Sequence, residues 1–296
     1  MVQQQLIPDE AMRFRILLQE KGLCTETISV FQAIIKKHYV ASGRHFPFCE
    51  PAHYQDPYRV VVSEIMLQQT QADRVVEKYL AFIDQFPTFE ALAAASTEDV
   101  LKQWIGLGYN RRALALKAIA ERVTNELGGI LPRTPEELRR FKGIGPNTAA
   151  SIAAFAFNAP VVFIETNIRT VYTHFFFGEE RGGEDTKILP IVEATLDRTD
   201  PRTWYYALMD YGVKLKREGK KAGRKQKIKA GSKPQPFKGS NRELRGQILK
   251  QLLDTQMDLD DLASILDLPR ERVEPIIMQL KAEGFLKNIN GFYRIT

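Results

Sequence analysis

The chain has 296 residues, with 42 Lys and Arg against 36 Asp and Glu, and its net charge is +6. This length allows two or more domains, and the positive charge favours a polyanionic partner, most simply nucleic acid. No stretch approaches the roughly 18 apolar residues of a membrane span, and no secretion signal is evident, so we expect a soluble, cytoplasmic, nucleoid-associated protein. The two cysteines, Cys24 and Cys49, lack a metal-ligand spacing and indicate reduced thiols, with a single disulfide as the alternative.

The first 218 residues are predicted to be almost entirely helical. Strand patterns are almost absent before residue 284. We therefore expect a mainly α domain over residues 1–218. Apolar periodicity predicts its helices over residues 9–41, from residue 58, and over 72–85, 88–93, 97–104, 110–127, 135–141, 147–157, 167–176, 186–197 and 201–216.

A basic segment follows this domain. Residues 219–240 contain several Lys and Arg and no Asp or Glu, and their glycines and prolines oppose regular structure. We interpret them as a basic linker that also touches DNA phosphates. A linker that is only solvated is the alternative.

Residues 241–296 form a second predicted domain. A helix begins near Arg242, Asp258 caps a short second helix, and a third helix precedes a hairpin around Asn290-Gly291, which is a strong turn pair. Three helices followed by a β-hairpin are typical of a small α/β winged-helix domain. Such domains bind DNA or partner proteins, and the sequence does not choose between the two.

A helix-hairpin-helix pattern occupies residues 138–157. Gly143-Ile144-Gly145 predicts a hairpin too tight for side chains, because two glycines can take positive φ. Pro146 suits the first position of the next helix, whose N-terminus and the hairpin amides favour an anion. We expect the hairpin to grip a DNA phosphate, and an ordinary helix-Gly-helix corner is the alternative. A Walker loop is excluded because no Gly-Lys-Ser/Thr follows.

Two carboxylates lie in unlike surroundings. Glu64 stands between apolar neighbours, so desolvation should raise its pKa and let it carry a proton at neutral pH. Glu165 stands where a turn opens the next helix and should stay ionised. One protonated and one charged carboxylate are the pair that breaks a glycosidic bond through an oxocarbenium-like state.

Four motifs in order resemble those of the MutY-type adenine DNA glycosylases, in the endonuclease III helix-hairpin-helix superfamily. The resemblance covers roughly residues 30–216, and its stretch Ser63–Gln71 is highly specific to the MutY branch. It implies a mainly α, two-lobed glycosylase domain with DNA in the cleft between the lobes. The motifs are Asp56–Gln71, Trp104–Ala113, Phe141–Ala149 and Met209–Gly212.

The resemblance implies catalytic roles for three residues. Glu64 matches the acid that protonates the departing adenine at N7. Glu165 matches the aspartate that stabilises the sugar cation, and is one methylene longer. Asn147 stands where endonuclease III relatives place a nucleophilic lysine, which argues for a monofunctional hydrolase rather than a Schiff-base lyase.

The resemblance also indicates how DNA is held. Flipping a base out of the duplex costs a few kcal/mol, and a protein wedge offsets part of that cost. Gln68 and Gln69, with Leu67 beside them, match the wedge, and Tyr109 lies in the motif that lines the opposite strand. The complete set of expected DNA-binding residues is Leu67, Gln68, Gln69, Thr70, Tyr109, Arg111, Lys142, Gly143, Gly145, Thr148 and Arg169.

The chain also departs from the family. Most relatives carry four cysteines for an iron-sulfur cluster after the motif at Met209–Gly212, and their absence here excludes such a cluster. The basic linker is expected to replace the DNA contacts of the cluster loop. Relatives often hold a monovalent cation on hairpin carbonyls, so K⁺ or Na⁺ near Gly143 is the one ion expected, with no other cofactor.

These observations predict hydrolysis of the N-glycosidic bond of adenine opposite guanine or 8-oxoguanine, as the first step of base excision repair. The expected partner is double-stranded DNA with a mispair or an oxidised base, and the protein should act as a monomer. The family's oxoguanine-sensing C-terminal domain is replaced by the winged helix, which leaves the opposite base open. Two alternatives remain: a thymine or uracil mismatch glycosylase of the same fold, and a non-catalytic DNA-binding protein, which Glu165 in place of aspartate keeps open.

Overall fold

A computed structural model describes residues 10–178, 184–221 and 239–296. Its contacts divide the chain into two discontinuous units. Unit 1 comprises residues 1–60, 133–139 and 145–230, and unit 2 comprises residues 61–132, 140–144 and 231–296. Among the described residues no helix combines the length and apolar character needed to cross a membrane.

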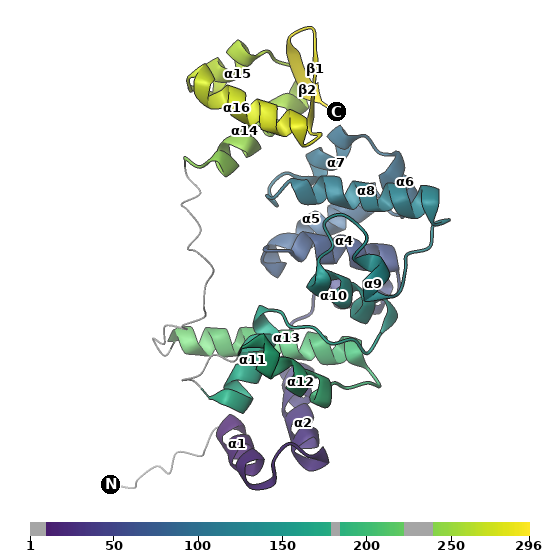
Figure 1. Ribbon diagram of the computed structural model, residues 1–296, viewed down its shortest axis with the longest axis vertical. Coiled ribbons are helices and arrows are strands. Elements are labelled where there is room, and N and C mark those ends of the chain that lie inside the picture. The colour runs from purple at the N-terminus through teal and green to yellow at the C-terminus, as the bar shows by residue number, and fades with distance from the viewer. Residues whose placement is uncertain (1–9, 179–183, 222–238) are drawn as a thin grey trace. The chain divides into compact units, whose positions relative to one another are not determined.

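The described chain is mainly α-helical, with one two-stranded sheet at its C-terminal end, which confirms the predicted fold class (Figure 1). The elements are α1 (Glu10–Lys21), α2 (Thr25–Ser42), the 3₁₀ helix η1 (Pro47–Cys49), α3 (Pro51–Tyr54), α4 (Pro57–Leu67), α5 (Ala72–Gln85), α6 (Phe89–Ala94), α7 (Thr97–Trp104), α8 (Arg111–Glu126), α9 (Pro135–Leu138), α10 (Pro146–Phe157), α11 (Thr166–Tyr172), the π-helix η2 (Thr173–Phe177), α12 (Asp185–Thr195), α13 (Pro201–Lys221), α14 (Asn241–Asp254), α15 (Leu259–Leu266), α16 (Arg270–Ala282), β1 (Leu286–Ile289) and β2 (Phe292–Ile295).

Three predicted boundaries were wrong. The helix expected over 135–141 ends at Leu138, and the chain then turns toward the hairpin. The helix expected over 167–176 is α-helical only to Tyr172 and continues as the π-helix η2. Helix α13 runs through Gly219 to Lys221, although it was predicted to end at residue 216. Most of the predicted linker, residues 222–238, lies outside the described residues.

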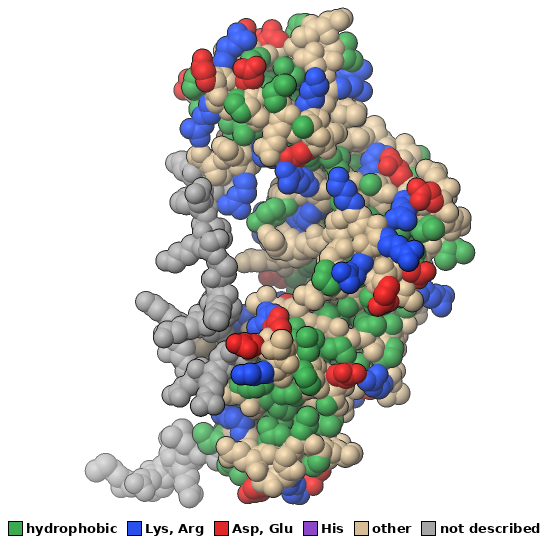
Figure 2. All heavy atoms as spheres, viewed as in Figure 1, with side chains coloured by type: hydrophobic (Ala, Val, Ile, Leu, Met, Phe, Trp, Pro, Cys, Tyr) green, Lys and Arg blue, Asp and Glu red, His purple; other side chains and the backbone are tan. Residues whose placement is uncertain are grey.

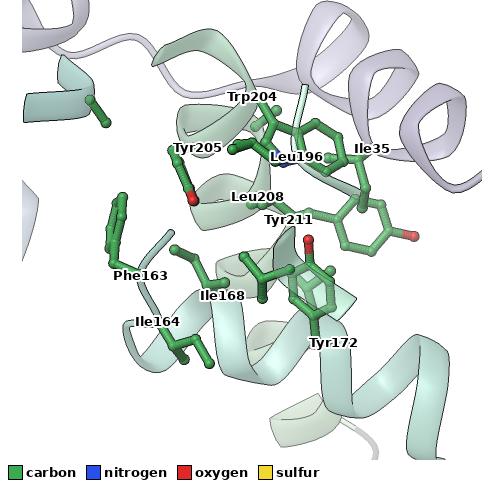
Figure 3. Packing of buried hydrophobic residues seen from close by; sticks show 14 of the residues in the cluster. Ile35, Phe163, Ile164, Ile168, Tyr172, Leu196, Trp204, Tyr205, Leu208 and Tyr211 are labelled. Carbon is green, nitrogen blue, oxygen red and sulfur yellow. The ribbon is translucent and has the colours of Figure 1, made fainter. Parts of the chain in front are cut away.

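The core of unit 1 is aromatic and joins α2, α11 and α13. On α13 the apolar residues recur at helical spacing, and Trp204 and Leu208 are fully buried. The Trp204 ring meets that of Phe31 edge to face, with centroids 5.7 Å apart. Figure 3 shows Tyr172 and Ile168 of α11 packed with the α13 side chains. Each such side chain stabilises the fold by roughly 1.5–3 kcal/mol, so the packing fixes the position of α11.

The helices of unit 2 have well-defined starts. Ser96 accepts the amide of Asp99 at 3.0 Å before α7, and Thr88 accepts the amide of Ala91 at 3.2 Å before α6. Buried side chains of α5, α7 and α8, including the fully buried Trp104, form the interior. This interior supports the loop between α7 and α8.

Residues 241–296 form three helices and a hairpin, as the sequence predicts for a winged helix. Asp258 caps α15 by accepting the amide of Asp261 at 2.8 Å. Asn290 and Gly291 both have positive φ, +52° and +90°, which is the geometry of a type I′ turn. The strands β1 and β2 pair antiparallel around this turn, and Met257 adds one bridge to Tyr293.

Candidate active site and DNA-binding elements

Glu64 lies on α4 in unit 2, one helical turn before the helix ends. Its side chain is partly exposed, while Val61 and Ile65 on either side in the sequence are fully buried. Apolar groups therefore flank this carboxylate, as the sequence predicts. Its raised pKa stays a prediction.

Glu165 is the N-cap of α11 in unit 1. Its Oε1 accepts the backbone amides of Asn167 at 2.7 Å and Ile168 at 3.0 Å. Burial nevertheless raises the pKa of Glu165 above its ordinary value, while the two amides and the positive charge of Lys216 act in the opposite direction. The helix N-terminus is thus not the only influence on this carboxylate, because the packing of α11 also desolvates it.

Asn167 and Lys216, which were not among the predicted site residues, complete the surroundings of Glu165. The side-chain amide of Asn167 donates to Glu165 Oε2 at 3.4 Å. The ammonium of Lys216, on α13, donates to Asn167 Oδ1 at 2.5 Å. The sequence does contain a signal for Lys216. It follows Gly212 of the Met209–Gly212 motif by four residues, which places the two on one face of a helix.

Asn147 lies at the second residue of α10, also in unit 1. Its side-chain amide donates to the carbonyl of Ile164 at 2.9 Å, directly before Glu165 in the chain. The structure therefore brings Asn147 to the segment that carries the predicted cation stabiliser. A carboxamide lacks the amine that a Schiff base requires.

Arg112 holds the backbone of the predicted wedge in unit 2, although its neighbour Arg111 was the predicted DNA-binding residue. Arg112 is 8% exposed, and its guanidinium donates to the carbonyls of Ile65 at 3.1 Å, Met66 at 2.8 Å and Gln68 at 2.6 Å. It also donates to the carbonyl of Gly108 at 3.0 Å. The last carbonyls of a helix lack intrahelical hydrogen-bond donors. Here the Arg112 side chain supplies these donors, and it also connects α4 to the loop before α8.

The same two segments contain unusual backbone geometry. Gln69 has φ of +55° and Tyr109 has φ of +49°, a left-handed conformation that is uncommon for residues other than glycine. The Arg112 guanidinium lies 5.4 Å from the centroid of the Tyr109 ring. Burial lowers the pKa of Arg112 to about 10, so this cation stays charged at neutral pH. Such strained residues gather at functional sites, where the surroundings hold them in place.

The hairpin glycines differ from each other, which corrects the prediction for one of them. Gly143 has φ of +91°, and a Cβ there would lie 2.7 Å from that of Ala115. Gly145 has φ of −83° and is the N-cap of α10, so it does not need positive φ. Pro146 occupies the first helical position, as expected.

A cation at the hairpin stays a prediction. Backbone carbonyls are suitable ligands for a hard cation, and the carbonyl of Gly143 is one candidate. That oxygen accepts the side-chain amide of Gln68 at 3.2 Å and keeps a second lone pair. The hairpin therefore offers one candidate ligand oxygen for a cation, the carbonyl oxygen of Gly143. In the described part of the chain, no group of three or more His, Cys, Asp or Glu is arranged to hold a metal.

Both predicted DNA-binding arginines form ion pairs. Arg111 Nε donates to Glu283 Oε2 at 2.7 Å within unit 2. This hydrogen bond, together with those from Arg245 and the charges of both arginines, lowers the pKa of Glu283 to about 2. Arg169 Nε donates to Asp185 Oδ1 at 2.8 Å within unit 1. A phosphate would have to compete with these carboxylates for either guanidinium.

The predicted site residues fall into both units. Figure 2 shows basic side chains, with acidic ones between them, over the visible face of helices α6 to α8 in unit 2. Unit 2 contains Glu64, Leu67, Gln68, Gln69, Thr70, Tyr109, Arg111, Lys142 and Gly143, and unit 1 contains Gly145, Asn147, Thr148, Glu165 and Arg169. Lys142 is exposed and Thr148 is partly buried.

Comparison with known proteins extends these observations. Residues 62–190 match the family model of HhH-GPD superfamily base excision DNA repair proteins. An adenine DNA glycosylase of Mycolicibacterium smegmatis is 34% identical over 232 residues, which cover 73% of this chain and 78% of that protein. A thymine/uracil-DNA glycosylase of Methanothermobacter thermautotrophicus is 28% identical over a stretch that covers 62% of this chain and 83% of that protein. The structure of a thermostable thymine-DNA glycosylase has a similar fold, with a TM-score of 0.56 and 24% identity over 70% of this chain and 89% of that one.

Proposed function

Because the chain belongs to the MutY-type adenine DNA glycosylases of the helix-hairpin-helix superfamily, we propose that it hydrolyses the N-glycosidic bond of adenine opposite guanine or 8-oxoguanine in double-stranded DNA. The observation that carries this proposal is the Ser63–Gln71 segment. It contains Glu64, a carboxylate with apolar flanks, just before the proposed wedge, and Arg112 donates hydrogen bonds to the backbone carbonyls of this stretch. The proposal includes action as a cytoplasmic monomer that starts base excision repair.

The proposed reaction uses the two carboxylates differently. Glu64 gives its proton to N7 of the extruded adenine, and the bond between C1′ and N9 breaks with its electron pair passing to the base. The ionised Glu165 stabilises the cationic sugar electrostatically. Water then adds to C1′, and its proton returns to Glu64. The products are free adenine and an abasic site.

A panel of duplexes tests the proposal. Each duplex carries one pair (adenine opposite 8-oxoguanine, adenine opposite guanine, thymine opposite guanine, or uracil opposite guanine), and the abasic product is measured by alkaline strand scission under single-turnover conditions. We expect release from the adenine duplexes and a loss of about 10²–10⁴-fold for Glu64→Gln, because removing a general acid has that effect. The matched control is Glu77→Gln, which changes an exposed carboxylate on α5 in the same way and should retain the wild-type rate. Full activity of Glu64→Gln would contradict its role as the acid.

A second candidate, a thymine or uracil mismatch glycosylase, is favoured by the similarity to the thymine/uracil-DNA glycosylase of Methanothermobacter thermautotrophicus. Chromatography of the released base separates the two candidates, since only the second liberates thymine or uracil. DNA binding without an abasic product from any duplex would instead support the non-catalytic alternative.

A further inference from the structure

Helices α11 and α13 approach each other unusually closely at one point in unit 1. A Cβ added to Gly212 of α13 would lie 2.5 Å from the backbone oxygen of Asn167, near the start of α11. The two backbones are therefore close enough that only glycine fits. One turn further along α13, this approach brings the Lys216 ammonium to Asn167 Oδ1 at 2.5 Å.

The contact with Lys216 determines how Asn167 meets Glu165. An ammonium can only donate hydrogen bonds, so the carboxamide must turn its oxygen toward Lys216 and its NH₂ group away. That NH₂ group donates to Glu165 Oε2 at 3.4 Å, and the Asn167 backbone amide donates to Oε1 at 2.7 Å. Lys216 thus orients the residue that holds both oxygens of the carboxylate.

Two cations act on Glu165 from the elements that pack around it. Arg169, one turn along α11, interacts with it electrostatically, but its guanidinium makes two hydrogen bonds to Asp185 of α12. Lys216, from α13, supplies the positive charge that opposes the effect of burial on Glu165. A carboxylate that is to face a sugar cation must remain charged in these partly dry surroundings.

We propose that Lys216 is a positioning residue for the glycosylase reaction, which acts through Asn167 to hold the Glu165 carboxylate oriented and charged. The role of Glu165 in the reaction rests on the proposed function, whereas the contact itself does not. Lys216 lies four residues beyond the Met209–Gly212 motif.

The first test is independent of activity. The carboxyl carbon of Glu165, assigned by comparison with Glu165→Gln, is titrated by ¹³C NMR in the wild type, Lys216→Met, Lys216→Arg and Lys214→Met. We expect the midpoint to rise by about one pH unit or more in Lys216→Met, because an adjacent opposite charge shifts a carboxyl pKa by that amount, and to return toward the wild-type value in Lys216→Arg. Lys214→Met removes the same charge from the same helix, but its ammonium lies over the Tyr211 ring at 4.7 Å, so the midpoint should stay near the wild-type value. An unchanged midpoint in Lys216→Met overturns the proposal.

The second test is the pH dependence of base release at saturating enzyme. Glu165, whose pKa is raised by burial in the folded protein, must be ionised for the reaction. The rate therefore falls as the pH drops through that pKa. This acid limb of the pH profile should move to higher pH in Lys216→Met. Below the wild-type midpoint we expect about a tenfold loss, which disappears at higher pH. A loss that is equal at every pH would mean a merely structural role and contradict the proposal.

Circular dichroism melts confirm folding, and Lys216→Gln is the second variant if Lys216→Met does not fold. If no duplex releases a base, the proposed function fails, and the NMR titration still decides the role of Lys216.

Discussion

Arg112 shows how one buried cation can set the conformation of a whole segment. Its hydrogen bonds to Met66 and Gln68 end α4 and hold the turn that follows, and its bond to Gly108 holds a second loop. A planar guanidinium has five N–H donors in fixed directions and can donate to several carbonyls at once. The ammonium of a lysine could not reach so many carbonyls in fixed directions.

The pair Arg112→Met and Arg111→Met tests this role. We expect Arg112→Met to lower the free energy of unfolding by about 2–4 kcal/mol, because each buried carbonyl left without a donor costs about 1–3 kcal/mol and some rehydrate. Arg111→Met removes the same charge from the adjacent residue, whose ion pair with Glu283 is largely exposed on the arginine side, and should cost at most about 1 kcal/mol. Urea unfolding followed by circular dichroism measures both, and equal losses would contradict the assignment.

At the scale of single residues, local chemistry was predictable and burial was not. Glu165 was correctly placed at a helix start, since that depends on its neighbours in the chain. The choice between Arg111 and Arg112 depends on which side of α8 meets the carbonyls of α4, and two adjacent arginines carry no signal for that. The same holds for the raised pKa of Glu165, which comes from its burial.

The contact between α11 and α13 shows what a glycine inside a helix can do. Glycine usually weakens a helix by roughly 0.5–1 kcal/mol relative to alanine. Helix α13 contains two, and they have different surroundings. Gly212 meets the Asn167 backbone, and a Cβ at Gly219 would have nothing within 4 Å.

We therefore expect opposite effects from the same substitution at these two positions. Gly212→Ala should lower the melting temperature and destabilise the fold by roughly 1–3 kcal/mol, because the added methyl group forces the helices apart. Gly219→Ala should leave the stability unchanged or raise it by up to about 1 kcal/mol, because it restores helix propensity without a clash. Thermal unfolding of both variants measures this difference, and a Gly212→Ala protein as stable as the wild type would show that the helices can separate freely.

At the scale of elements, the predictions succeeded where a cap or turn residue specifies the boundary. Asp258, Pro146 and Asn290-Gly291 each sit where the sequence places them. The end of α13 was missed because Gly219 and the lysines around it were interpreted as irregular. A single glycine lowers helix propensity without ending a helix that is anchored by its apolar face.

At the scale of the whole molecule, the charge of the chain is concentrated in the predicted basic linker. Lys225 and Lys227 lie within it, in a run with no acidic residue. Each phosphate contact that a protein makes releases counterions, so log Kd depends on log salt with a slope of about 0.9 per contact. The linker should therefore contribute to the salt dependence of DNA binding.

The double variant Lys225→Gln, Lys227→Gln tests this contribution. We expect weaker DNA binding and a salt slope that is smaller by about 1–2, as measured by fluorescence anisotropy from 50 to 200 mM salt. The control is Lys21→Gln, Lys37→Gln, which removes the same charge from exposed positions on α1 and α2. An identical slope in the linker variant and the wild type would refute the phosphate contacts.

The division into units was not predictable from motifs. Gly143 and Gly145 belong to one sequence motif, yet they fall into different units. A motif reports residues that are close along the chain, whereas a unit is defined by contacts between distant segments. For the same reason, no local pattern groups residues 231–296 with residues 61–132.

The hold of Arg112 on the turn after α4 has a thermodynamic consequence. A segment that is already fixed in the unbound protein loses little conformational entropy when it meets a ligand. The left-handed backbone at Gln69 likewise forms when the protein folds. The free energy of folding therefore offsets its strain, and the free energy of ligand binding does not have to. In the proposed reaction, more of the free energy of DNA binding is then available to extrude a base from the stack.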